Sequence, residues 1–550
     1  MSTTLAGRRS PTAPTPHTSG PFTGTGTMVR FMLRRDRVRL PAWLAGHGLF
    51  VLYIAAALPQ IAPTEDDLQA VVPLLQQPVG RMFTGPALGM EDPTYERFFA
   101  SGYAPYLFLL SALMSLLLVV RHTRAEEQSG RAELVRANVA GRDAGLAATL
   151  LLALLANAGA ALIVAALAAA VGFAPTGSVL VGLGTGLVGM AFSGVAAVTA
   201  QFFESPRAAA GAAGAVLGAA FMLRALGDMA AAGGSALSWT SPLGWAAQTG
   251  PYVLDRFWPL VPLAAVALVT GAGAFALQRR RDLGAGLVAE RPGPGEASRS
   301  LGTPLGLAAR LQRASIWGWG AAIVVLGSVD GAFTQVMVEG VEEMPETVRD
   351  MFGMEALVSG YLAFLAAFSG YLTTAYVVYA VQSLSGEEAR GRAEAVLATP
   401  TSRTAWAGAH LLVVAAGAAG ILVVAGLGTG VAAAAVTGDG SLVIELVAAH
   451  VNVLPAVLVV LAVCAVLYGW APALLAPVGW ALVGLIVFVG NFAAMLDLPR
   501  WLQNLSPLSY PAQLPVEDFA LLPILVLLAI AVLGVGLGLV GVRRRQIGVR

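Results

Sequence analysis

The stretch EEQSGRAE, Glu126–Glu133, recurs almost unchanged as EEARGRAE, Glu387–Glu394. Extending the comparison to residues 126–142 and 387–403 gives nine identities in 17 positions without a gap. The octet is conspicuous because its charged residues stand in a chain that is otherwise largely apolar. Its return 261 residues later indicates two copies of one unit in this chain.

Three other pairs of short motifs occur in the same order in the two halves of the sequence. They are SGY at 101 and 359, SPLGWAAQ at 241 and SPLSYPAQ at 506, and RRRDLG at 279 and RRRQIG at 543. The spacings of these three pairs are 258, 265 and 264 residues, so small insertions keep all of them in register with the octet. Chance does not easily place four pairs in one order at one spacing, and we therefore predict a duplication.

The composition places the chain in the membrane class. Hydrophobic residues make up 57% and charged residues 12% of 550 residues, and the mean hydropathy is +0.73. Leu146–Gly172 runs for 27 residues without a charge, which exceeds the roughly 20 residues that span a bilayer core. Apolar runs predict an all-α fold with about twelve spans, near 41–61, 103–121, 144–172, 178–200, 208–226, 258–278, 315–335, 357–382, 405–436, 447–470, 474–495 and 520–542.

The distribution of arginine predicts the orientation, because cytoplasmic loops collect basic residues. The sequence has no lysine, and 27 of its 33 arginines fall in alternate segments that include both termini. Both termini are therefore expected to be cytoplasmic. Six spans return the chain to its starting side, so the two halves are expected to be parallel repeats.

These patterns give four expected regions. Residues 1–27 are rich in Ser, Thr, Pro and Gly and lack the apolar core of a signal peptide, so we expect a disordered tail. The first six-span half is expected at 28–288 and the second at 307–550. A Pro/Gly/Ser-rich cytoplasmic linker at 289–306 joins them.

Both octets are expected to lie in the cytoplasmic loop between the second and third spans of their half. As helices they would form acid-first i,i+4 pairs, Glu127 with Arg131 and Glu388 with Arg392. A solvated connector is the simpler interpretation of a charge run. Retention of these residues in both halves favours a docking site for a partner, since many other sequences would be equally soluble.

Several chemistries are disfavoured. A P-loop requires lysine, so this chain has no nucleotide-binding motif of that kind. Acidic residues fall in loops or at span ends, which disfavours proton or sodium coupling through buried acids. The single cysteine, Cys464, and five scattered histidines indicate neither a disulfide nor a metal site, and a net charge of +1 gives no nucleic-acid signal. Two related halves are what transporters use for alternating access, and energy for such transport would then come from a separate protein docked at the octets.

Beyond these patterns, the chain resembles a known family: the permease subunits of ATP-binding-cassette exporters, in the actinobacterial group of polyketide-antibiotic and multidrug exporters. The resemblance covers about residues 28–550. It rests on the duplicated six-span layout, the EExxGRAE loops, LATPTSR at 397–403, the SPLxW/Y motifs, and the arginine-rich segments RFMLRRDRVRLPAW and LAARLQRASIWGW. It implies a bacterial cell-membrane permease without a catalytic site, two copies of a partner ATPase that bind ATP and Mg, and export of apolar or amphipathic small molecules.

The resemblance also assigns roles to residues of this sequence. The ATPase-coupling residues would be Glu126, Glu127, Gly130, Arg131, Glu133, Glu387, Glu388, Gly391, Arg392 and Glu394. Arginines of interfacial helices, facing lipid or the ATPase, would be Arg34, Arg35, Arg37, Arg39, Arg310 and Arg313. Aromatic residues bordering the substrate path would be Tyr103, Tyr106, Phe108, Tyr361, Phe364, Phe368 and Tyr371. Topogenic charge and ordinary helix packing are the simpler interpretations of the last two sets.

Two other functions remain open at this stage. A secondary antiporter of the major-facilitator type also has twelve spans in two halves, but its glycine-aspartate-arginine loop signature is absent here. A membrane scaffold or sensor linked to an ATPase is the second.

Small-residue pairs, Gly182/Gly186, Gly426/Gly430 and Gly534/Gly538, predict close helix packing, and Asn157 predicts hydrogen bonding between helices.

Overall fold

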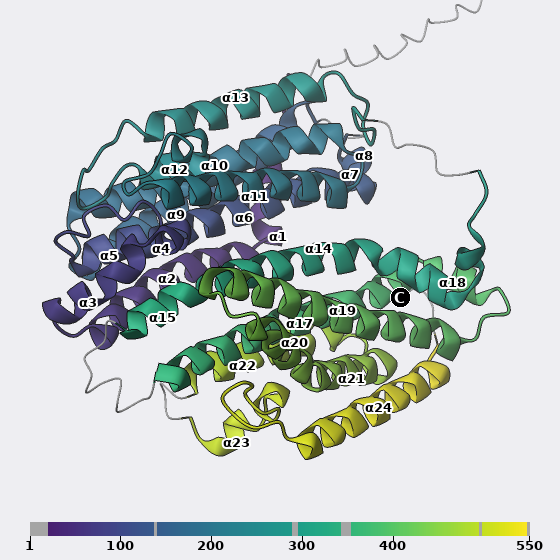
Figure 1. Cartoon of the computed structure of the whole chain (residues 1–550). Coiled ribbons are helices and arrows are strands. Elements are labelled where there is room, and N and C mark those ends of the chain that lie inside the picture. Colours follow the sequence, from purple (N-terminus) through teal and green to yellow (C-terminus); the bar gives the residue numbers. More distant parts are fainter. Residues whose placement is uncertain (1–19, 137–139, 289–294, 343–353, 494–497, 547–550) are drawn as a thin grey trace, which may run out of the picture. The chain divides into compact units, whose positions relative to one another are not determined.

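A computed structural model describes residues 20–136, 140–288, 295–342, 354–493 and 498–546. Across these residues the regular structure is helical, with no β-strand. The chain divides into two compact units, Met1–Pro292 and Gly293–Arg550, which are described separately below (Figure 1). The expected all-α membrane class is confirmed.

The described residues of the first unit form six long helices and several short ones. The long helices are α2 (Arg39–Ile61), α6 (Ala104–His122), α9 (Ala144–Ala170), α10 (Pro175–Phe202), α11 (Pro206–Ala230) and α13 (Leu260–Gln278). The short ones are α1 (Thr25–Arg35), α3 (Glu65–Gln76), α4 (Pro78–Thr84), α5 (Tyr95–Gly102), α7 (Arg124–Gln128), α8 (Arg131–Arg136), η1 (Ser238–Thr240) and α12 (Pro242–Ala247).

The second unit follows the same order. Its long helices are α14 (Pro304–Ala332), α17 (Met354–Ala389), α19 (Arg403–Thr437), α21 (Leu454–Trp470), α22 (Leu475–Phe492) and α24 (Leu521–Arg544). The others are η2 (Arg299–Gly302), α15 (Thr334–Glu342), α18 (Arg392–Leu397), α20 (Ser441–Asn452), α23 (Arg500–Gln503) and η3 (Pro507–Ser509). At 1.5 Å per residue the 36-residue α17 is about 54 Å long, so it extends well beyond a hydrocarbon core of about 30 Å.

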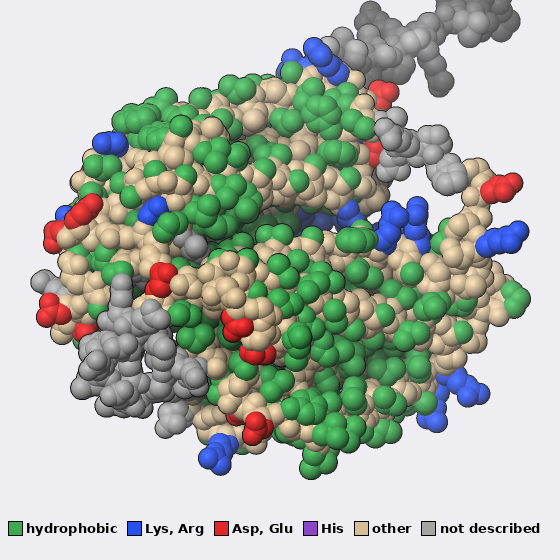
Figure 2. Space-filling view, viewed as in Figure 1, with side chains coloured by type: hydrophobic (Ala, Val, Ile, Leu, Met, Phe, Trp, Pro, Cys, Tyr) green, Lys and Arg blue, Asp and Glu red, His purple; other side chains and the backbone are tan. Residues whose placement is uncertain are grey.

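The predicted spans correspond to helices of the structure. By length and composition, eleven helices in the described part of the chain are apolar enough to cross a membrane. A shorter apolar helix, Leu475–Asn491, occupies the place of the predicted span 474–495, the end of which lies outside the described residues. Figure 2 shows hydrophobic side chains covering the flanks of the helices, with most charged side chains near their ends.

The two ends of the first unit correspond to the two predicted sides of the membrane. Figure 1 shows α7 and α8 at one end and α3, α4 and α5 at the other. At the predicted outer end, Arg81 Nε donates to the Asp228 carbonyl at 2.8 Å, and Glu96 Oε2 accepts from the Ala174 amide at 2.7 Å. Segments assigned to one side of the membrane therefore lie at the same end of this unit, as they must if an even number of spans separates them.

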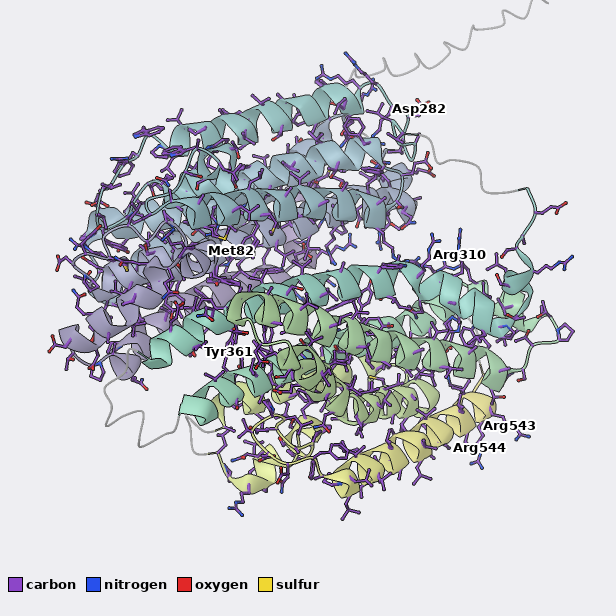
Figure 3. All side chains as sticks on the ribbon, viewed as in Figure 1. Met82, Asp282, Arg310, Tyr361, Arg543 and Arg544 are labelled. Carbon is purple, nitrogen blue, oxygen red and sulfur yellow. The ribbon has the colours of Figure 1, made fainter. Side chains whose placement is uncertain are left out.

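The second unit has the same two-ended arrangement. At one end Arg403 Nη1 donates to the Arg545 carbonyl at 2.8 Å, and at the other the Tyr361 hydroxyl donates to the Asp330 carbonyl at 2.6 Å. Figure 3 labels Tyr361 at one end of this unit and Arg543 and Arg544 at the other. The end that carries α18 is therefore also the end at which α24 finishes (Figure 1).

Helix neighbours are equivalent in the two units. In the first, α10 packs against α6, α9 and α13, and in the second α20 and α21 together pack against α17, α19 and α24. The helix that is continuous in the first unit is split in the second because Pro455 lacks an amide proton and its ring clashes with the preceding turn. Repeated neighbour relations of this kind are the structural counterpart of the repeated motifs.

The predicted small-residue contacts are confirmed. A Cβ added at Gly182 would lie 2.5 Å from the Ala161 carbonyl oxygen, and one at Gly538 would lie 2.5 Å from the Ala465 carbonyl. At the other members of the three pairs an added Cβ would lie only 2.7–2.9 Å from the nearest neighbouring atom; these are Gly186, Gly426, Gly430 and Gly534. Asn157 Nδ2 donates to Ser115 Oγ at 2.8 Å, which links α9 to α6 as expected.

Some boundaries differ from the predictions. Most of the predicted tail, residues 1–19, lies outside the described residues, but α1 already begins at Thr25. Within the predicted linker, residues 289–294 are likewise outside the description, and its last residues begin α14 at Pro304. The predicted span 208–226 lies within the long helix α11, in which Arg224 is buried beside Asp228 at 3.4 Å. Its charge is thus paired one turn away rather than exposed to lipid.

Candidate functional site

The two octets form two similar loops, one in each unit. We call Arg124–Arg136 the first octet loop and Glu387–Leu397 the second octet loop. In the first, α7 and α8 are separated by Gly130, which has a φ of 73°. In the second, Gly391 has a φ of 71° between the end of α17 and the start of α18. Left-handed backbone of this kind favours glycine, because a Cβ would strain it.

This break makes the predicted i,i+4 pairs wrong. Arg131 Nε donates to Glu126 at 3.0 Å rather than to Glu127, and Arg392 binds Glu387 rather than Glu388. Each partner lies five residues away because the left-handed glycine ends one helical segment before the arginine begins the next. The i,i+4 rule holds only within a continuous helix.

The second glutamate of the first octet is held by an arginine that lies just beyond the unit's last long helix. Arg281 donates to Glu127 through Nη2 to Oε1 at 2.6 Å and through Nη1 to Oε2 at 2.9 Å. Arg124 Nη1 adds a contact to Oε2 at 2.9 Å. The Glu127 and Arg281 side chains are 12% and 5% exposed, so this is a nearly buried, two-pronged ion pair.

The second octet repeats this contact with the equivalent arginine. Arg545 donates to Glu388 at 2.5 and 2.8 Å, and the Tyr468 hydroxyl donates to the same carboxylate. Both arginines are the third of their triplets, RRRDLG and RRRQIG. We call the pairs Glu127–Arg281 and Glu388–Arg545 the acid–arginine clamps, because each fastens an octet loop to residues just beyond its unit's last long helix.

The first glutamate of each octet braces the turn. Glu387 accepts from Arg392 Nε at 2.7 Å and Nη2 at 2.5 Å, and this hydrogen-bonded carboxylate raises the pKa of Arg392 above its ordinary value. Glu126 binds Arg131 and also Arg35 of α1. The predicted coupling residues Glu126, Glu127, Glu387 and Glu388 therefore all use their carboxylates inside the chain.

Each octet also carries side chains that are exposed to solvent, although Ala393 of the second octet is buried. Glu133 on α8 and Glu394 on α18 are exposed, as are the neighbouring Leu134 and Ala395. Leu134 is 70% exposed. The short helices α8 and α18 thus present the part of each octet that a partner can reach.

Comparison with known proteins gives a consistent result. Residues 301–543 match the family model described as the C-terminal domain of the multidrug efflux system permease Rv1217c. Over 560 residues the chain is 37% identical to the multidrug efflux system permease protein Rv1217c of Mycobacterium tuberculosis, with 100% of each chain covered. The chain belongs to this permease family. The resemblance to exporter permeases is confirmed, and the permease is a multi-pass protein of the cell membrane.

The predicted interfacial arginines of the permease separate into two groups. Arg35 is the exception, because its side chain is only 24% exposed and binds Glu126. The exposed members are Arg34, Arg37, Arg39, Arg310 and Arg313. Figure 3 shows Arg310 extending outward from α14. An arginine predicted to face lipid or a partner instead holds the first octet loop against α1.

The aromatic residues predicted to border a substrate path also differ in exposure. Phe108 and Tyr371 are buried within their own units at 1% and 6% exposure. Tyr106 and Phe364 are 36% and 45% exposed, and Phe364 stacks on Phe368 with ring centroids 6.0 Å apart. Tyr103, Tyr361 and Phe368 are partly buried. Only part of the predicted set therefore lies on a surface of its unit.

Sequence reasoning missed Arg281, Arg545, Tyr468 and Arg124 as parts of the site. A signal for the first two was present, since the arginine triplets and the octets were both repeated in register. Two motifs retained together in both halves are candidates for mutual contact. No comparable signal marks Tyr468 or Arg124, which lie outside the matched motifs.

Proposed function

We propose that this permease is the membrane subunit of an ATP-driven exporter that expels apolar or amphipathic drug-like compounds. Two copies of a separate ATPase, which bind ATP and Mg, would dock on the two octet loops. The observation that carries the proposal is that both units build the same loop with the same clamp. Membership in the family of multidrug efflux permeases supports the transport role.

Within the octets the roles divide by exposure. The clamped glutamates, Glu127 and Glu388, position the loops, because their oxygens are already occupied by Arg281 and Arg545. The exposed faces of α8 and α18 would seat in the ATPase, through Glu133 and Leu134 in one copy and Glu394 and Ala395 in the other. Fastening each loop to the end of α13 or α24 provides a physical route by which ATPase movement reaches a spanning helix.

The exposed aromatic residues are the better candidates for contacting cargo. Tyr106 and Phe364 lie on surfaces of their units, whereas Phe108 and Tyr371 fill space inside them. Removing Phe108 or Tyr371 would leave a cavity in the packed bundle, at a cost of about 3–5 kcal/mol for a buried aromatic residue. Removal of Tyr106 or Phe364 should change transport with little loss of stability.

The docking proposal is tested with the permease and its ATPase expressed together. Glu133→Arg combined with Glu394→Arg reverses the charge on both exposed faces and should abolish co-purification and drug-stimulated ATP hydrolysis. Each single substitution should leave one docked ATPase. The matched control is Gln128→Arg, which adds a charge at an exposed position of the same first loop.

Unchanged co-purification of the doubly substituted permease would contradict the docking role. Transport that continues without ATP hydrolysis and stops when the proton gradient is collapsed would favour a secondary antiporter. An intact ATPase complex that confers no drug resistance in a deletion strain would favour a scaffold or sensor.

A further inference from the structure

A cavity lies beneath the first octet loop, inside the first unit. It has a volume of about 360 Å³, within the usual range of small-molecule sites. Its walls are α1, α7, α8, the ends of α6, α10 and α13, and the start of α9. We call it the α1 pocket. Neither the proposed docking nor the aromatic path uses it.

One wall of the α1 pocket is apolar. Met28, Phe31 and Met32 project from α1, and Val135 and Leu146 come from α8 and α9. Phe31 of α1 is 60% exposed, and the arginines near it on the same helix, Arg30 and Arg34, are exposed as well. A helix with exposed apolar and basic side chains is suited to the membrane surface, where it meets both acyl chains and phosphates.

The other wall is charged, with an excess of arginine. Its arginines and glutamates are Arg35, Arg131, Arg142, Arg281, Glu126 and Glu127. Four guanidinium groups against two carboxylates give this wall an excess of positive charge. His122, which also lines the pocket, is bound to Asp36 at 2.6 Å. A cavity with an apolar wall and an arginine excess favours a ligand with an anionic head and an apolar tail.

Arg131 is the group best placed to receive such a head. It contacts Glu126 through Nε, at 3.0 Å, and its side chain is 54% exposed. Its two terminal nitrogens take no part in that contact. In the second octet loop Arg392 uses both Nε and Nη2 on Glu387, so the equivalent arginine is already engaged in two bonds.

We propose that the α1 pocket binds an anionic phospholipid, with its phosphate on Arg131 and Arg35 and the upper part of an acyl chain along Met28, Phe31 and Val135. Guanidinium groups bind phosphate oxygens in paired, charge-assisted hydrogen bonds. Basic pockets at the membrane surface attract anionic lipid head groups. A lipid is favoured over a soluble anion because one wall of the pocket is apolar and α1 carries surface-seeking residues.

The test uses the full-length permease without its ATPase, so its outcome does not depend on the docking proposal. The protein is delipidated in detergent, incubated with palmitoyl-oleoyl phosphatidylglycerol or phosphatidylcholine, and analysed by native mass spectrometry. Wild type should retain one phosphatidylglycerol that phosphatidylcholine does not replace. Arg131→Gln should weaken this retention by about tenfold or more, as expected for loss of charged hydrogen bonds.

Three further variants accompany this one, two of them as controls. Arg392→Gln makes the same change in the second octet loop and should retain the lipid. Val135→Trp fills the pocket without removing a charge and should lose the lipid, whereas Leu134→Trp, at a neighbouring exposed position, should keep it. Each variant is first checked for a single symmetrical peak in size-exclusion chromatography and for a wild-type melting temperature.

Three results would overturn the proposal. Equal retention of the two lipids by wild type would remove the requirement for a negative charge. Equal retention by Arg131→Gln and Arg392→Gln would place any bound lipid elsewhere. Displacement of phosphatidylglycerol by millimolar inorganic phosphate would indicate a site for a free anion rather than for a lipid.

Discussion

The two octet loops differ in how many partners hold them, although their octet sequences are nearly the same. In the first loop Glu127 is bound by Arg281 and Arg124, and Glu126 by Arg131 and Arg35. In the second, Glu388 is bound by Arg545 and Tyr468, and Glu387 by Arg392 alone among the described contacts. Two contacts are common to both units. One is the acid–arginine clamp, and the other, which we call the brace, is the ion pair between the first glutamate of the octet and the arginine that follows the turn glycine.

This difference separates the contacts that both loops have from those that only one loop has. The clamp and the brace are present twice, built from equivalent residues in two units. Arg35 and Arg124 contribute only to the first loop, where α1 and the α1 pocket are also found. The first loop is therefore more heavily supported, and the second depends more on its single clamp arginine.

Removing the clamp arginine should have the largest effect, and a larger one in the second loop. Arg545→Ala leaves Glu388 with only Tyr468 among the described contacts, and we expect local opening to become easier by about 2–3 kcal/mol. Arg281→Ala should cost less, because Arg124 still binds Glu127. Hydrogen–deuterium exchange of peptides covering 387–397 and 124–136 measures both effects.

The matched control for this pair is Arg544→Ala, which removes the neighbouring arginine of the same triplet. It should leave exchange in the second octet loop unchanged. Arg545→Lys should restore only part of the protection, since an ammonium group does not reproduce the two-pronged geometry. Equal effects of Arg281→Ala and Arg545→Ala would show that Arg124 adds nothing.

Replacing the turn glycines should have an intermediate effect that is the same in both loops. Gly130→Ala and Gly391→Ala each place a Cβ in left-handed backbone, at a cost of about 1–2 kcal/mol. A methyl group at Gly130 would have no other residue's atom within 4 Å beyond its chain neighbours, so the penalty there comes from the backbone alone. Thermal unfolding and drug-stimulated ATP hydrolysis of the assembled exporter measure it.

Gly386→Ala is the control for this comparison. Gly386 lies in helical backbone of α17 with open space around it, so alanine there should be neutral or slightly stabilising. A clear difference between Gly130→Ala and Gly391→Ala would mean that the surroundings, and not the turn, determine the cost.

The smallest effect is expected from Arg35, which supports the first loop only. Arg35→Gln removes a partly exposed ion pair worth about 1 kcal/mol or less. Exchange should rise modestly in residues 124–136 and remain unchanged in 387–397. Arg34→Gln, at the exposed neighbouring position, should change neither peptide. A response of the second loop to Arg35→Gln would contradict the assignment of Arg35 to the first.

The spans and the repeat were predictable because their signals are local. A run such as Leu146–Gly172 is uncharged over its whole length, and no tertiary contact is needed to recognise it. The octets were found by direct comparison of the sequence with itself. Helix breaks at Asp36 and Pro455 were not anticipated, and only the second has an evident local cause in proline.

The contacts of the octets were predicted less well. The i,i+4 rule was applied across Gly130 and Gly391, where left-handed backbone interrupts the helix and shifts each arginine to the other glutamate. The glycine inside each charged stretch was a sequence signal that the helix is interrupted there. Arg35 was grouped with lipid-facing arginines because its sequence neighbours are basic, and only packing of α1 against the first loop distinguishes it.

The sequence by itself determined a duplicated membrane protein with an equivalent charged loop in each half, because hydrophobic length and internal repetition are properties of neighbouring residues. The tertiary structure alone decided which arginine holds which glutamate. The clamp partners are 154 residues apart in the first unit and 157 in the second. Contacts over such separations depend on how the helices of a unit pack, and packing is set by the shapes and burial of many side chains together rather than by any single pattern.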